Sequence, residues 1–191
     1  MSFLAMILAF APWVAFKIIL YLPFFNELTM LKIGLVTAAS ISAYRILKGL
    51  DKGLIAWGSG AFFGFSLIMV VGLTNVWYMI HLGVFSNGTL ALMTWASVVL
   101  GNPFTLAYAK QTVDSKYWDT PRFIHKNYKI TAAWGLSFSI GVVDALLKQQ
   151  YPEIPWYVFE IIDDSAMLAA ILFTTHLSKP PSQLAEAVAT D

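Results

Sequence analysis

WYVFEIIDDSAMLAAILFTTHL, residues 156–177, is the stretch that decides the fold of this chain. A helix that crosses a bilayer needs about 20 mostly apolar residues, and this stretch supplies them. Its first half nevertheless carries Glu160, Asp163 and Asp164, which stand at positions i, i+3 and i+4 and so share one face of a helix. The stretch predicts a membrane helix with an acidic face near its beginning.

The composition of the whole chain agrees with a membrane protein. Of the 191 residues, 58% are hydrophobic and 12% are charged, and the mean hydropathy is +0.68. A soluble domain has about 25% charged residues. The formal net charge is +1, so no basic surface points to a nucleic-acid partner. Cysteine is absent, which excludes disulfides, thiolate metal sites and cysteine nucleophiles.

Hydropathy predicts an all-α, polytopic transmembrane helix bundle with six spans. We place the spans at residues 3–22, 28–47, 54–73, 90–109, 130–147 and 156–177. They form one transmembrane domain, residues 1–178, followed by a short flexible cytoplasmic tail, 179–191. An uncharged connection, TNVWYMIHLGVFSNGT, joins the third and fourth spans and is expected at the membrane interface. Five spans with a re-entrant segment around residues 75–87 are the alternative.

Lysine and arginine predict the orientation, because cytoplasmic loops retain them. One side of the predicted bundle holds nine and the other holds three. The nine are Arg45, Lys48, Lys52, Lys110, Lys116, Arg122, Lys126, Lys129 and Lys179, and the three are Lys17, Lys32 and Lys148. Both termini are therefore expected in the cytoplasm.

The acidic face is the first candidate site. Asp144, near the end of the fifth span, falls at a depth similar to the three acids of the sixth, so four carboxylates converge near the outer end of the bundle. Acids within a membrane usually face a bundle interior or a water-filled cavity, which points to a cation or proton site. In the simpler interpretation they lie in the headgroup zone and pair with Lys17 or Lys32.

No motif indicates a catalytic, metal or cofactor site. A dinuclear metal site in a bundle requires two Glu-x-x-His motifs, and no histidine lies near Glu160 and Asp163 in the sequence. The chain also lacks H-E-x-x-H, G-x-S-x-G, Walker A and G-x-G-x-x-G patterns. We therefore expect a protein that is not an enzyme and has no cofactor.

The most polar segment is AKQTVDSKYWDTPRFIHKNYK, residues 109–129. Its basic residues and aromatic rings suit anionic lipid headgroups or a partner protein, and they also suit the simpler role of fixing topology and depth. The residues of this surface are Lys110, Lys116, Trp118, Arg122, Lys126 and Lys129.

Four stretches resemble the bacterial intracellular septation protein A family of small inner-membrane proteins. They are APWVAFKIILYL (11–22), AYRILKGLDKGLIAWGSGAFFGFSL (43–67), NPFTLAYAK (102–110) and YWDTPRFIHKNYKITAAWGLSFSI (117–140). The resemblance covers roughly residues 3–172 and implies a role in envelope maintenance and division, without catalytic residues. The FEIIDD start of the last span departs from the family pattern.

These observations predict a non-enzymatic membrane protein that acts through contacts with lipids and with a membrane-protein partner or further copies of itself, in envelope or division roles or as an accessory subunit. The alternative is a small cation- or proton-coupled transporter or channel that uses the carboxylates.

Overall fold

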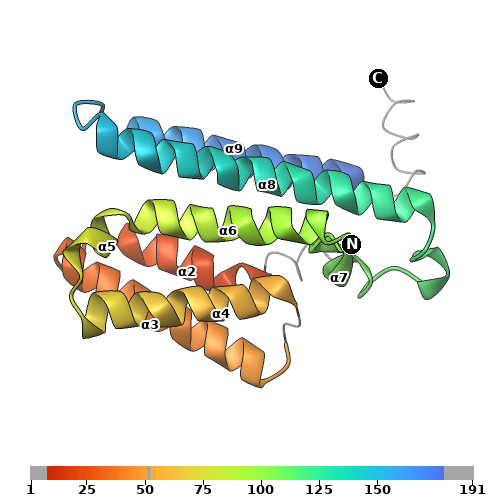
Figure 1. Ribbon diagram of the computed structural model, residues 1–191, viewed down its shortest axis with the longest axis horizontal. Helices are drawn as coiled ribbons and strands as arrows, with labels where there is room; N and C mark the ends of the chain where they lie inside the picture. The colour runs from red at the N-terminus through yellow and green to blue at the C-terminus, as the bar shows by residue number, and fades with distance from the viewer. Residues whose placement is uncertain (1–7, 51–52, 179–191) are drawn as a thin grey trace.

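The computed structural model describes residues 8–50 and 53–178, and within them every regular element is a helix (Figure 1). The elements are α2 (Ala11–Leu20), α3 (Glu27–Leu47), α4 (Leu54–Leu67), the π-helix η1 (Ile68–Gly72), α5 (Val76–Ile80), α6 (Leu82–Val99), α7 (Thr105–Ala109), the 3₁₀ helix η2 (Ser115–Tyr117), α8 (Pro121–Gln150) and α9 (Trp156–Ser178). The predicted tail, 179–191, and the first five residues of the predicted first span lie outside the described residues.

The long helices run back and forth between two ends of the molecule. At the left end of Figure 1 lie the turn between α2 and α3, the short helix α5, and the turn between α8 and α9. At the right end lie the link from α3 to α4, and α7 with η2. The connections that the sequence assigns to one side of the membrane thus share one end.

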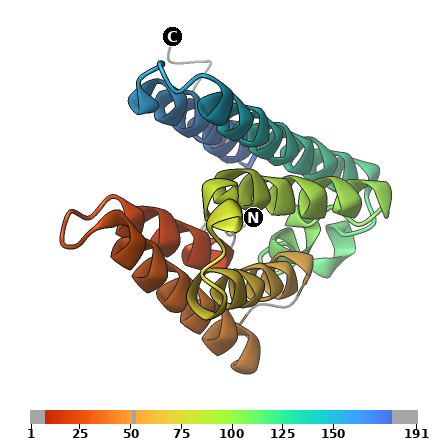
Figure 2. The same cartoon turned by 60° about the vertical axis from the view of Figure 1, so that its left-hand side comes forward.

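α6 lies in the middle of the bundle. The hairpin of α8 and α9 packs against it from one side, whereas α4, which continues the hairpin of α2 and α3, packs from the other. Figure 2 shows the α8–α9 pair and the α2–α3 pair on opposite sides of α6. The backbones of α2 and α9 do not pack closely along their length, so contact between these two helices depends on long side chains.

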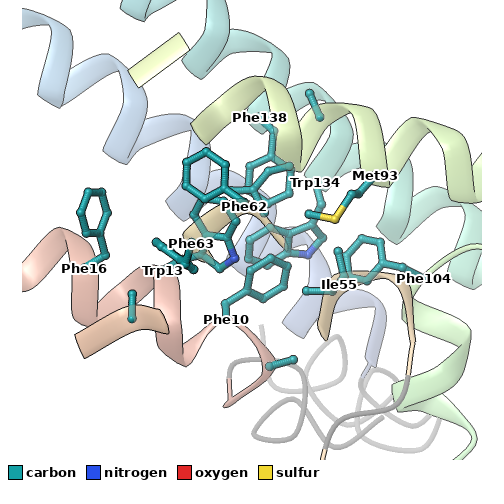
Figure 3. Close-up of a cluster of buried hydrophobic side chains, with 14 of the residues drawn as sticks. Phe10, Trp13, Phe16, Ile55, Phe62, Phe63, Met93, Phe104, Trp134 and Phe138 are labelled. Carbon is teal, nitrogen blue, oxygen red and sulfur yellow. The ribbon is translucent and has the colours of Figure 1, made fainter. Parts of the chain in front are cut away.

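Aromatic side chains fill the space where α2, α4 and α8 meet (Figure 3). Phe10 stacks on Trp134, with ring centroids 5.3 Å apart, and Trp13 stacks on Phe62 at 4.8 Å. The indole Nε1 of Trp13 donates to Ser59 Oγ at 2.7 Å, which satisfies its only polar atom away from water. This cluster fixes α2 against both halves of the bundle.

Capping residues explain where several helices begin. The Asn26 side chain accepts a hydrogen bond from Thr29 N at 2.9 Å and starts α3, and Asn75 does the same for α5 through Tyr78 N. Pro12 lies in the first turn of α2, where its missing N–H has no partner to lose, so it does not kink the helix interior.

The fourth predicted span has the wrong boundaries. It was placed at residues 90–109, but α6 begins at Leu82 and ends at Val99. Gly101 then adopts a φ of 74°, a conformation that suits glycine, and Pro103 cannot supply a helical N–H. The uncharged connection before this span is largely helical, because α5 and the first turns of α6 occupy it.

α8 is longer than the fifth span predicted at residues 130–147. It has 30 residues and takes in the last part of the polar segment, from Pro121 to Lys129, with three of its basic residues. Proline at the first helical position favours this start. Positive charge alone was the reason to treat the segment as a loop, and charge at the end of a long helix is compatible with the helix protruding from a bilayer.

Within residues 8–50 and 53–178, four helical segments are long and apolar enough to cross a membrane: Glu27–Leu47, Leu54–Gly72, Leu82–Val99 and Pro121–Gln150. α9, which covers the predicted sixth span, is not one of them. The second combines α4 with η1, close to the predicted 54–73. α2 is a shorter apolar helix of 10 residues. The chain is therefore an all-helical protein with the features of a membrane protein.

Candidate functional site

Lys17 joins α2 to α9 at the left end of the bundle. Its Nζ lies 3.0 Å from Asp163 Oδ2, 2.5 Å from Asp164 Oδ1 and 3.9 Å from Glu160 Oε2. The i, i+3, i+4 spacing of the three acids lets one ammonium group reach them all. The three acids share one face of α9, and of the two lysines that the sequence left open as partners, Lys17 is the one that meets them.

Two further side chains hold Glu160 in place. Lys148 Nζ, near the end of α8, pairs with Glu160 Oε1 at 3.1 Å. The hydroxyl of Tyr21, just after α2, donates a hydrogen bond to Glu160 Oε2. Glu160 thus receives contacts from three directions and ties α2, α8 and α9 together.

Asp144 has a different environment from the other acids. It belongs to α8 and only 8% of its surface is exposed. Its Oδ1 is buried and has no hydrogen-bond partner within the described residues. Leaving a buried carboxylate oxygen without a partner is costly, so this position calls for an explanation beyond helix packing.

Asn87 of α6 and Gly141 of α8 lie beside Asp163, one of the acids paired with Lys17. Asn87 Nδ2 donates to the carbonyl oxygens of Gly83 and Gly141, each at 3.3 Å. A Cβ placed on Gly141 would lie 2.7 Å from Asn87 Oδ1 and 2.8 Å from Asp163 Oδ1. Because glycine has no side chain at position 141, both oxygens can lie this close to α8.

Together the four carboxylates of Asp144, Glu160, Asp163 and Asp164 face two ammonium groups, those of Lys17 and Lys148. Four negative and two positive formal charges leave the cluster at −2 when every group is ionised. We call these six residues, with Tyr21 and Asn87, the acidic cluster. It can hold helices together and can accept a positive charge.

Lys32 was predicted as a member of the cluster, but no ion pair or hydrogen bond in the described part of the chain links it to these acids. It lies on α3, on the far side of α2 from α9. A metal site was not expected, and among the described residues no group of three or more His, Asp or Glu side chains is placed to hold a metal ion.

The basic surface lies at the opposite end of the bundle. Lys110 Nζ lies 5.2 Å from the ring centroid of Trp118, and Trp118 Nε1 donates to Val113 O at 2.8 Å. Lys116 pairs with Asp114 at 3.2 Å. Arg122, Lys126 and Lys129 follow on the first turns of α8, where Arg122 and Lys129 are exposed. The residues predicted for this surface are thus gathered at one end.

Three members of the acidic cluster were not predicted. Lys148 was treated only as a topology signal, Asn87 as part of a connection, and Tyr21 was not singled out. Helix spacing could have identified one of them. Lys148 follows Asp144 by four residues, so both lie on one face of α8. No comparable spacing identifies Asn87, because its neighbours come from another helix.

Comparison of the chain with family models, with curated proteins and with solved structures finds no match.

Proposed function

We propose that this chain is a non-enzymatic integral protein of a bacterial inner membrane that works through contacts with other membrane proteins. In this proposal the six spans predicted from hydropathy cross the bilayer, four of them as helices long and apolar enough to do so, and both termini lie in the cytoplasm. The observation that carries the proposal is the pairing of the α9 acids: Lys17 and Lys148 neutralise Glu160 and Asp163 across three helices. Acids held in such ion pairs stabilise the arrangement of the helices.

The resemblance to the intracellular septation protein A family supports a place in envelope maintenance or division, or as an accessory subunit of a larger membrane complex. The basic surface supplies a docking face of suitable chemistry, because lysine and arginine beside Trp118 can contact anionic headgroups or an acidic partner. The outer face of the bundle exposes large apolar side chains, as expected for helices in contact with lipid or with another membrane protein.

The test is purification of the tagged chain in native lipid discs, without a detergent wash. We expect a membrane-protein partner in fixed stoichiometry, or a homo-oligomer. Arg122→Gln combined with Lys129→Gln should weaken a partner bound at the basic surface, whereas Lys32→Gln, which also removes a charge but lies on α3, should retain it. A chain that purifies only as a monomer would contradict the proposal.

The second candidate function is proton- or cation-coupled transport. One observation favours it, the buried and unpartnered Oδ1 of Asp144, because architecture alone does not require a carboxylate there. Its test is flux into liposomes that contain the purified chain. Asp144→Asn should abolish the flux, and Asp114→Asn, at the exposed opposite end, should leave it unchanged.

A further inference from the structure

Acceptor oxygens gather beside Gly141 without a donor between them. Asn87 Oδ1 and Asp163 Oδ1 both lie within 2.8 Å of the point where a Gly141 Cβ would be. The other oxygen of Asp163, Oδ2, is the one that binds Lys17. No hydrogen bond in the described part of the chain reaches Asn87 Oδ1 or Asp163 Oδ1. Two electron-rich oxygens therefore face the same small space.

Asp144 adds a carboxylate to that space. It follows Gly141 by three residues, and a helical side chain leans back toward the preceding turn, over residues i−3 and i−4. This lean puts the side chain of Asp144 on the same face of α8 as Gly141, and Asp163 is one of the charged groups that act on it. Its Oδ1 is buried and has no hydrogen-bond partner within the described residues, an observation that is independent of the α9 acids.

The orientation of Asn87 is fixed by its other contacts. Its amide nitrogen faces two carbonyl oxygens, those of Gly83 and Gly141, and both can only accept. Turning the amide over would place its oxygen against these carbonyls. Asn87 therefore presents its oxygen, not its N–H, to Asp163, and it cannot relieve the acids by donating to them.

We propose that Asp144 and Asp163 form a carboxyl pair that holds one exchangeable proton, with Asn87 Oδ1 as a further acceptor. The proton binds to one carboxylate oxygen as an O–H bond and donates to a neighbouring acceptor. This removes one negative charge from the acidic cluster and supplies the donor that its oxygens lack. Two carboxylates held close together generally share one proton in this way.

The charged groups that act on Asp144 come from α2, α8 and α9. The carboxylates that act on it are Asp163 and Glu160 of α9, and the ammonium groups are Lys148 of α8 and Lys17 of α2. Both lysines are already committed to α9 acids. A proton, unlike a metal ion, needs only two oxygens, which agrees with the absence of a metal-holding group among the described residues.

The proton site does not depend on the proposed role in contacts with other membrane proteins. Proton-coupled transport, the second candidate function, would require such a site. Binding and transport can be separated by experiment: an infrared measurement reports the proton, and the liposome flux assay reports its movement. A site that holds a proton without flux would leave the second candidate function without support while the proton site stands.

The experiment is infrared spectroscopy of the full chain in lipid discs, across a pH series, in H₂O and D₂O. An ordinary aspartate is only about one part in a thousand protonated at about pH 7. We expect one protonated carboxyl per chain at about that pH, seen as a C=O stretching band that shifts in D₂O and disappears at alkaline pH. Labelling aspartate with ¹³C should shift the band, which assigns it to Asp and not to Glu160.

Asp144→Asn and Asp163→Asn should each remove the band at about pH 7, whereas Asp114→Asn, in an exposed pair with Lys116, should retain it. The wild-type pH and isotope series tests the proposal even where a variant fails to fold. Absence of the band in the wild-type chain would overturn the proposal, as would its persistence in folded Asp144→Asn. Stabilisation by Na⁺ in a chain without the band would assign the space to a metal cation.

Discussion

At the scale of single residues, Lys17 links α2 to the acidic face of α9. One ammonium group serves three carboxylates on α9, and it does so across a gap that backbone packing does not close. Removing it leaves several negative charges facing one another in a site that is only partly open to water. Lys148 serves one carboxylate and is more exposed, so its loss has a smaller effect.

Lys17→Met should lower the free energy of unfolding by about 1–2 kcal/mol, less than the loss of a fully buried partner because the pairs are partly exposed. Lys148→Met should cost under about 1 kcal/mol. Thermal unfolding of the purified chain in one detergent measures both. Lys32→Met is the matched control, and a loss as large as that of Lys17→Met would mean that the ion pairs are not the cause.

The sequence could predict the shared face of Glu160, Asp163 and Asp164, because that depends only on helix spacing. It could not decide between Lys17 and Lys32 as partners. In a soluble helix the apolar stripe shows which face is buried, but helices in lipid are apolar on all sides, so the rotation of α2 and α3 is not encoded in periodicity. Asn87 was missed for the same reason.

At the scale of helices, close packing of α6 on α8 depends on glycine. A Cβ on Gly135 would lie 2.8 Å from Trp95 Cε2, a separation that real Cβ contacts essentially never show, and 3.2 Å from Thr94 Cγ2, which is tighter than most. Trp95 cannot turn away freely, because its Nε1 donates to Ser139 Oγ at 3.1 Å. The indole ring and α8 are therefore fitted to a position without a side chain.

Gly135→Ala should destabilise the chain by about 1–3 kcal/mol, because overpacking forces the indole or the helices to shift. Gly88→Ala, on α6, is the matched control: nothing lies within 4 Å of its added Cβ, and alanine favours a helix by about 1 kcal/mol. The free energy of unfolding should therefore fall in Gly135→Ala and rise in Gly88→Ala. Equal effects would show that the α6–α8 contact tolerates a larger side chain.

Helix positions followed from hydropathy where charge or a capping residue marked the boundary, as at Asn26 for α3. They failed at the fourth span, since no charge separates α5 from α6 and an uninterrupted apolar sequence does not show where a helix starts. They also failed for α8, whose first turns are basic but still helical. Hydropathy detects the part of a helix that lies in lipid, not its ends.

At the scale of the whole molecule, the two ends of the bundle differ in chemistry. One end carries the acidic cluster and the turn at residues 151–155, and the other carries the basic surface (Figure 1). The excess of lysine and arginine predicts that the basic end faces the cytoplasm, and the acidic cluster is then proposed to lie toward the outer face. The chain has no cysteine, which makes this orientation directly testable.

A single cysteine at Glu153 or at Ser115 gives matched reporters, since both positions are exposed and lie at opposite ends. In spheroplasts, a maleimide that cannot cross membranes should label Glu153→Cys, whereas Ser115→Cys should react only after the membrane is permeabilised. The reverse pattern would place the acidic cluster in the cytoplasm and the basic surface outside. In that case the proposed proton of the acidic cluster would exchange with the cytoplasm, and the basic surface could not bind cytoplasmic lipids or partners.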